Sequence, residues 1–350
     1  MLARRRIVRL KNGVELQTPA LVPALSSVAT APILHAAAKS RKPQLTPCSL
    51  VHSEMLSYGL DDAVVLISAY DISNNLLTDA ESLRRGFLNS SWSRPRLLII
   101  DSGWYEKEGS PQGGVFADGM TPPLPWEEAD YENTLDSLDP ELQAAIVTWD
   151  CAEGSYAEQI GRAQAFFSRW PRFSSIALLK PPSDSRFHRL DGMTGDDISN
   201  LRAFDVVGVT EKELGETVLD RLVALGQLRR RMDEHDVSAP IHVFGGLDPL
   251  FTPLLFAAGG EIFDGLSWLR YAYHHGQAIH RESAALLNQQ VDDRWSLVLG
   301  RVQIANLTAL RELDGELALF VHHNGDWSRF RQGSVLEPVY DRFQAKLGRA

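Results

Sequence analysis

The stretch PIHVFGGLDPLFTPLLFAAGGEIFDG, residues 240–265, contains two short apolar runs, 240–246 and 261–265, separated by a longer segment. Each run ends in glycine or aspartate, and Asp264 follows directly after two apolar residues. Runs that are nearly continuous in aliphatic and aromatic residues are typical of strands buried on both faces of a parallel sheet. A carboxylate at the end of such a strand raises the question of what it does there.

The same kind of run occurs six more times earlier in the chain: ALVPAL (20–25), AVVLIS (63–68), RLLIID (96–101), AAIVTWD (144–150), SSIALLK (174–180) and FDVVGV (204–209). Segments with apolar residues at three- and four-residue steps separate most of the runs, which is typical of amphipathic helices. Eight strands that alternate with helices predict a closed (β/α)8 barrel, the TIM barrel. We expect residues 1–350 to form one domain of this kind.

The sequence after residue 280 predicts helices. Five apolar residues share one stripe at helical spacing: Leu307, Leu310, Leu313, Leu317 and Phe320. We therefore expect 281–350 to be a C-terminal helical extension that packs on the barrel. Two earlier segments, 106–133 and 181–200, are rich in glycine, proline and acidic residues and lack a helical period, so we expect long loops there.

Composition excludes several classes of protein. The formal net charge of -10 argues against a protein that coats nucleic acid by bulk attraction, although a local basic face stays possible. Two cysteines are too few for a disulfide framework or for a cysteine-based zinc site. No apolar run approaches the ~18 residues of a membrane span, and no apolar signal region follows the basic start, so we expect a cytoplasmic protein without a membrane partner.

A barrel of this kind carries its chemistry on the loops that follow the C-terminal ends of its strands. Three carboxylates, Asp101, Asp150 and Asp264, end predicted strands and would converge on one mouth. Asp101 and Asp264 suit glycosidic chemistry, in which one acts as nucleophile and the other moves a proton. A metal-dependent hydrolase that uses all three with a histidine is nearly as plausible from spacing alone, so both interpretations stay open.

Several motifs occur in the order found in one known family. IIDSGWYE (99–106) resembles a TDSGGFQ motif, WDCAEG (149–154) resembles FDECTP, and 261–278 resembles FDCVLPTRNARNGQA. Weaker matches lie at 12–27, where the family has a small strand pair before its first barrel strand, and at 64–72 and 206–216. Over roughly residues 5–320 the chain is therefore similar to the tRNA-guanine transglycosylase superfamily, TIM-barrel enzymes that exchange a guanine for a 7-deazaguanine.

The resemblance implies a role for each matching position. Asp264 would be the nucleophile at C1' of the target nucleotide, and Asp101 the general acid and base. The substrate-binding residues would be Ser102, Tyr105, Asp150, Gly208, Val209, Thr210, Gly245 and Gly246. Residues at the rim would contact the nucleic acid: Trp104, Arg270, Tyr271, Tyr273 and His275. His274 and His275 are not expected to form a metal pair, because adjacent side chains point apart.

Departures from the family pattern change what the resemblance implies. Ala305 stands where the family has a histidine ligand of structural zinc, and no cysteine follows Cys151, so we expect no metal and no cofactor. Lys180 ends the fifth run where the tRNA enzymes have a base-reading glutamine and glycine. This combination favours the branch that inserts 7-deazaguanine into DNA. Expected partners are DNA, the free 7-deazaguanine base, helper proteins that open DNA, and a second copy in a homodimer.

Three alternatives stay open. The chain could be a tRNA enzyme that works without zinc, a noncatalytic partner subunit of such an enzyme, or an unrelated barrel hydrolase. Retention of both Asp101 and Asp264 speaks against the noncatalytic subunit.

Overall fold

Eight parallel strands close into a barrel in the order β10-β3-β4-β5-β6-β7-β8-β9. The computed structural model describes residues 1–27, 63–76, 95–108, 124–150 and 154–349. The barrel strands are β3 (Ala20–Leu25), β4 (Val64–Ser68), β5 (Leu97–Asp101), β6 (Ala144–Val147), β7 (Ser174–Leu179), β8 (Val206–Thr210), β9 (Ile241–Phe244) and β10 (Ile262–Gly265). Each of the eight predicted runs contains one of these strands, so the predicted TIM barrel is confirmed.

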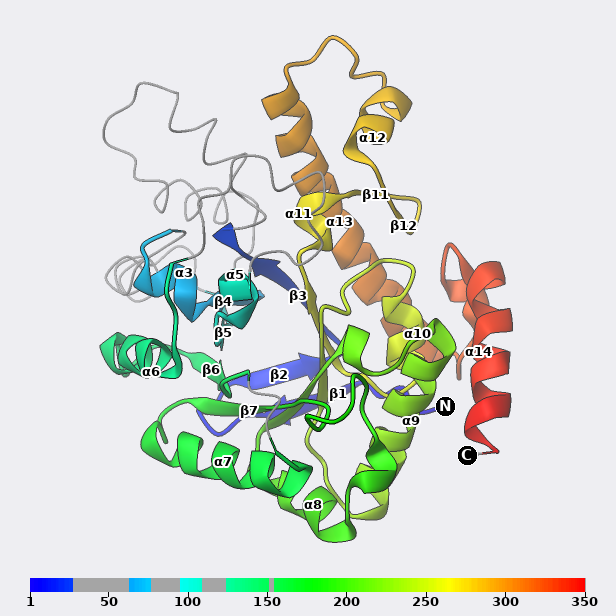
Figure 1. The fold of residues 1–350 in the computed structure, drawn as a ribbon. Coiled ribbons are helices and arrows are strands. Elements are labelled where there is room, and N and C mark those ends of the chain that lie inside the picture. Colours follow the sequence, from blue (N-terminus) through cyan, green and yellow to red (C-terminus); the bar gives the residue numbers. More distant parts are fainter. Residues whose placement is uncertain (28–62, 77–94, 109–123, 151–153, 350) are drawn as a thin grey trace.

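Helices follow the strands on the outside of the barrel (Figure 1). They are α6 (Glu128–Ser137), α7 (Tyr156–Arg169), α8 (Gly195–Asn200), α9 (Val218–Glu234) and α10 (Thr252–Ala257), with short helices α3 (Ala69–Ser73), α5 (Trp104–Glu108) and α11 (Ser267–Arg270) directly after strands. Capping boxes begin α7, α8 and α9, because a serine or threonine precedes an acidic residue by three positions at each start. In the described ranges, no helix has both the length and the apolar character needed to cross a membrane.

The two segments expected to be long loops are partly helical, which corrects that prediction. The first begins within α5 and ends within α6, and its middle, 109–123, lies outside the described residues. The second contains the short 3-10 helix η2 (Leu190–Gly192) and α8. The second segment forms α8 although it has few apolar residues, because a capping box starts this helix and Ile198 is completely buried.

Alternation along each strand decides which side chains enter the barrel. On β5, Leu97 and Ile99 pack in the interior, whereas Leu98 and Ile100 pack against the helices. On β10, Ile262 is interior and Phe263 faces the helices, so the next residue, Asp264, points into the barrel again. The polar residues that end these strands therefore close the top of an apolar interior.

Two additions flank the barrel, as expected. An antiparallel pair, β1 (Arg6–Arg9) and β2 (Glu15–Thr18), precedes it. After β10 come the hairpin β11 (Ala272–His274) and β12 (Gln277–Ile279), then α12 (Arg281–Leu287), α13 (Trp295–His322), the 3-10 helix η5 (Trp327–Arg329) and α14 (Gly333–Leu347). Two short 3-10 helices, η3 (Leu201–Ala203) and η4 (Glu211–Glu213), lie on either side of β8 along the chain. All five residues of the predicted stripe on α13 are buried, and α14 packs on α9 and α10. Figure 1 shows α12 and the start of α13 extending past the barrel on the side of α11.

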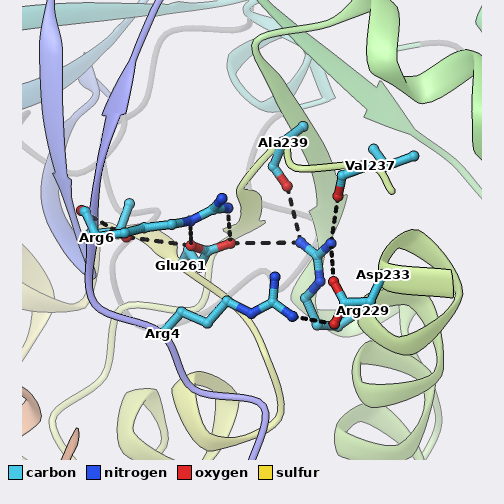
Figure 2. Close-up of polar contacts among 8 residues, drawn as sticks. Arg4, Arg6, Arg229, Asp233, Val237, Ala239 and Glu261 are labelled. Atoms are coloured by element: carbon cyan, nitrogen blue, oxygen red, sulfur yellow. Dashed lines mark hydrogen bonds and ion pairs between the residues drawn. The ribbon is translucent and has the colours of Figure 1, made fainter. Parts of the chain in front are cut away.

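A buried ion network supports the start of β10 (Figure 2). Glu261 is completely buried, and its two carboxylate oxygens accept hydrogen bonds from Arg6 Nε at 2.7 Å and Nη2 at 2.8 Å. Arg229, also completely buried, lies 3.7 Å from the other side of the same carboxylate. The network ties the N-terminal strand pair and α9 to the strand that carries Asp264.

The remaining donors of Arg229 are almost fully used. They meet the carbonyl oxygens of Ala239 at 3.0 Å and Val237 at 2.7 Å, and the carboxylate of Asp233 at 2.7 Å (Figure 2). Asp233 also pairs with Arg4. Removal of one member of such a network leaves its buried partners without compensation.

Replacing the buried arginine tests this account of the network. We expect Arg229→Met to lower the free energy of unfolding by about 3–5 kcal/mol, because the carboxylate of Glu261 stays buried after losing a cation. Urea unfolding followed by circular dichroism measures the change. Arg342→Met on α14 is the matched control, since Arg342 is exposed, and we expect a change within about 0.5 kcal/mol. Equal stability of the two variants would contradict the role of the network.

Candidate active site at the barrel mouth

Three predicted carboxylates gather at the mouth of the barrel. Asp264 is 6% exposed at the end of β10, and Asp101 ends β5. Burial raises the pKa of Asp101 to about 7, and the charges of Glu106, Asp150 and Asp264 contribute to the rise. Asp101, Asp150 and Asp264 are therefore close enough to interact electrostatically, as the positions at strand ends predicted.

Two donors hold one oxygen of Asp264. His242 Nε2 lies 3.0 Å from Asp264 Oδ1, and the backbone N–H of Gly245 donates to the same oxygen over 3.2 Å. The resemblance assigned Gly245 to the substrate, whereas here its N–H contacts the predicted nucleophile. Sequence reasoning missed His242, although alternation along β9 indicated that a residue two positions before Phe244 shares its side of the strand.

The predicted pocket residues of β8 have different environments. Gly208 faces Phe244, and a Cβ built at residue 208 would lie 2.7 Å from the Cε2 atom of that ring. The side chain of Val209 is buried among the outer core residues, which leaves only the backbone of this residue for the predicted pocket. Thr210 is partly exposed at the end of β8. Gly246 lies in the tight turn after β9, where its N–H bonds to the carbonyl oxygen of Val243.

Lys180 joins the site as a cation between two carboxylates. Its Nζ lies 3.0 Å from Asp150 Oδ1 and 2.8 Å from Glu213 Oε1. Burial alone lowers the pKa of Lys180, but the two carboxylates outweigh it and the net pKa is raised. Asp150, predicted to bind a base edge, therefore presents its carboxylate beside a charged donor.

Two further acids, Asp71 and Glu106, lie buried beside the mouth. Asp71 accepts hydrogen bonds from Ser27 N at 2.9 Å and Ser27 Oγ at 2.5 Å, and Glu106 accepts one from Ser26 Oγ at 2.5 Å. Burial raises the pKa of Asp71 to about 7 and that of Glu106 to about 8, and the charge of Asp71 adds to the rise at Glu106. The sequence alone did not indicate that these two acids are buried, because burial depends on the packed loops.

The predicted base-binding residues after β5 lie side by side in sequence. Ser102 is completely buried, and its hydroxyl has no hydrogen-bond partner within the described ranges. Tyr105 is partly exposed, and its hydroxyl accepts a hydrogen bond from Arg270. Trp104 is also partly exposed, and Lys107 Nζ lies 4.5 Å from the centre of its ring. The structure thus brings Tyr105 and Arg270 together although 165 positions separate them.

Only part of the predicted rim is available to a nucleic acid. Tyr271 is partly exposed and His275 is exposed at the turn of the β11–β12 hairpin. Tyr273 is 7% exposed, and its hydroxyl bonds to Ser267 Oγ at 2.6 Å, so its assignment to the rim is wrong. The backbone N–H of Tyr273 donates to Asn306 Oδ1 of α13 over 2.6 Å.

Asn306 forms hydrogen bonds with three backbone groups in the segment that follows Asp264. Its buried amide also donates to the carbonyl oxygens of Trp268 at 2.6 Å and Tyr271 at 2.8 Å. The neighbouring residue Ala305, for which the resemblance expected a zinc-binding histidine, is exposed on α13. No group of three or more histidine, cysteine, aspartate or glutamate residues among the described positions is arranged to hold a metal ion, and Cys151 lies outside them.

Comparison with models of known protein families and with curated proteins finds no match for this chain. The TIM barrel hosts many unrelated activities, so the fold alone does not indicate one. What distinguishes this barrel is the set of groups at its mouth: Asp101, Asp150, Lys180 and Asp264 with the donors that hold them.

The buried acids make stability depend on pH. An aspartate or glutamate whose pKa is raised on folding keeps its proton in the folded state, so folding loses stability as pH rises above the unfolded value. Glu106 has a pKa of about 8 against an ordinary value of 4.5. We therefore expect the free energy of unfolding to fall between pH 4.5 and pH 8, and Glu106→Gln to reduce this fall.

Urea unfolding at a series of pH values measures the effect. We expect Glu106→Gln to exceed the unsubstituted protein in stability at pH 8 and to approach it at low pH, because glutamine resembles the protonated acid. Glu337→Gln, at an exposed position of α14, serves as control and should leave the pH dependence unchanged. A Glu106→Gln profile that runs parallel to that of the control would show that Glu106 is not buried in its protonated form.

Proposed function

We propose that this protein is a nucleic-acid guanine transglycosylase that exchanges guanine for a 7-deazaguanine in DNA through a covalent aspartyl-sugar intermediate. The observation that carries the proposal is that Asp264 and Asp101 lie at the same barrel mouth. One oxygen of Asp264 is held by two donors, and Asp101 has a pKa close to neutrality. These are the properties that a positioned nucleophile and a general acid and base require.

The reaction needs two displacements at the same sugar carbon. In the first, a carboxylate oxygen of Asp264 bonds to C1', the C1'–N9 bond breaks with its electron pair going to the base, and Asp101 gives a proton to the departing guanine. In the second, Asp101 takes a proton from the incoming base. A nitrogen of that base then bonds to C1', and the ester bond to Asp264 breaks. The enzyme ends in its starting protonation state.

The other polar groups of the mouth fit the edge of a guanine-like base. Such an edge presents N–H donors next to a carbonyl acceptor, and the pair of Asp150 and Lys180 presents an acceptor next to a donor, 3.0 Å apart. The buried hydroxyl of Ser102 has no partner within the described ranges, so it is able to serve a bound base. Tyr105 offers an aromatic face beside these groups.

The nucleic acid would approach over the rim beside α5 and α11. Arg270, fixed against the hydroxyl of Tyr105, supplies a cation for a backbone phosphate. Trp104 is a partly exposed ring beside the same mouth, suited to stacking on an extruded base or its neighbour. The replacement of the base-reading residues of tRNA enzymes by Lys180 is what favours DNA over tRNA.

A metal-dependent hydrolase is one of the alternatives that the strand-end carboxylates leave open, and one contact counts against it. Lys180 occupies the side of Asp150 that a divalent cation would need, and it contacts both oxygens of that carboxylate, at 3.0 and 3.3 Å. A cation bound there would have to displace a buried ammonium group. For this reason the transglycosylase accounts for more of the site.

Isotope exchange tests the proposed reaction. Labelled guanine is incubated with the protein and, in parallel, with duplex DNA, single-stranded DNA or bulk tRNA. We expect label in DNA, and we expect Asp264→Asn to lower the rate by at least about 10⁴-fold, as for other catalytic nucleophiles. Asp196→Asn, an exposed aspartate on α8, is the control and should retain full activity. Label only in tRNA would contradict the DNA assignment, and label in neither would contradict the exchange activity.

The pH dependence of guanine release tests the role of Asp101. Release in a single turnover needs the protonated acid, so we expect its rate to fall as pH rises through about 7, the pKa of Asp101. Glu106→Gln should move this inflection to lower pH, because the charge of Glu106 contributes to the raised pKa. Glu337→Gln should leave the inflection in place. If Glu106→Gln leaves the pH of the inflection unchanged, the proton given to guanine comes from a group other than Asp101.

A further inference from the structure

We infer that His242 is the positioning residue of the nucleophile: its neutral imidazole donates from Nε2 to Asp264 Oδ1 and so turns Oδ2 toward the substrate. This inference rests on the proposed function, since it assigns a residue to the same site. It goes beyond it because no matching motif gave His242 a role, and because it specifies which carboxylate oxygen reacts.

The contacts of Asp264 are one-sided. Both hydrogen bonds to its carboxylate, from His242 Nε2 and from the N–H of Gly245, end on Oδ1. Within the part of the chain that the structure describes, no hydrogen bond reaches Oδ2. A carboxylate held at one oxygen cannot rotate freely about its Cβ–Cγ bond, so the other oxygen keeps one direction.

The state of the imidazole follows from its two nitrogen atoms. A carboxylate oxygen only accepts, so Nε2 must carry the hydrogen that it shares with Asp264. His242 is completely buried, and its Nδ1 has no hydrogen-bond partner within the described ranges. An N–H at that position would be a buried donor without an acceptor, which is unfavourable. The ring is therefore the neutral tautomer with a bare Nδ1.

Neighbouring residues clamp the ring in place. The ring of Phe244 lies 3.8 Å from that of His242, centre to centre, with an angle of 22° between their planes. Gly208, opposite His242 in the register of β8 and β9, leaves the space that Phe244 fills. The absence of a side chain at Gly208 therefore allows Phe244 to pack on His242, and His242 in turn holds Asp264.

The same two donors act in both displacements. While the ester exists, Oδ1 is its carbonyl oxygen, and the donors polarise that carbonyl. When the C1'–Oδ2 bond breaks, the electron pair of that bond returns to the carboxylate, whose developing charge the donors stabilise without reorganisation. No oxidant, metal or further reactant is needed for this role.

Two substitutions separate positioning from packing. His242→Phe keeps a ring beside Phe244 and removes the donor, whereas His242→Gln restores an N–H donor of similar reach. We expect His242→Phe to lower kcat for guanine exchange into DNA by about 10²-fold with KM within about twofold, as when one preorganised donor is lost. We expect His242→Gln to recover at least about tenfold of that loss. Equal losses in both variants, or a loss confined to KM, would overturn the inference.

A second measurement does not depend on the reaction. Nitrogen-15 NMR of the histidine-labelled full chain at pH 7, with His242→Gln to identify the signal, reports which ring nitrogen carries a proton. We expect a neutral ring protonated at Nε2. A ring protonated at Nδ1, or at both nitrogens, would overturn the inference even in an active enzyme. If the unsubstituted protein shows the expected tautomer but exchanges no guanine, the result contradicts the proposed function. The hydrogen bond from His242 to Asp264 would still be supported.

Discussion

The parallel pairing of β10 with β3 is the contact on which the rest of the structure depends, because it joins the last barrel strand to the first. In its register, Asp264 lies beside Val22, and the buried carboxylate of Glu261 anchors the start of the same strand. Without this closure the ends of β5 and β10 would not face one mouth. The network around Glu261 thus stabilises, from the opposite end of β10, the strand that carries the proposed nucleophile.

Charge at the mouth is arranged in two groups with different surroundings. Asp71 and Glu106 are buried and Asp101 is partly exposed, and burial is the first cause of the raised pKa of each. The charge of Asp71 adds to the rise at Glu106, and the charges of Glu106, Asp150 and Asp264 add to the rise at Asp101. Asp150, by contrast, is paired with Lys180, and donors hold Asp264. One set of carboxyl groups therefore holds protons near neutral pH while the other is compensated by donors, a division that suits acid and base chemistry beside a nucleophile.

Lys180 and Asn306 each support the barrel mouth through several contacts. Lys180 neutralises Asp150 and Glu213 at once, so an uncharged side chain there would leave these two carboxylates without a cation. Asn306, next to Ala305, braces the loop after Asp264 through three hydrogen bonds. In this chain, hydrogen bonds from α13 therefore support the segment that follows Asp264.

Alternation of apolar runs and helical segments was sufficient to predict the barrel, the C-terminal helices and the gathering of Asp101, Asp150 and Asp264, because strand period and the common direction of parallel strands are local properties. The helical ends of the two acidic segments, the burial of Tyr273 and the outward side chain of Val209 required the packed structure. So did the bond from His242 to Asp264, 22 positions apart. Burial and hydrogen-bond partners depend on which segments meet, and only the closed barrel decides that.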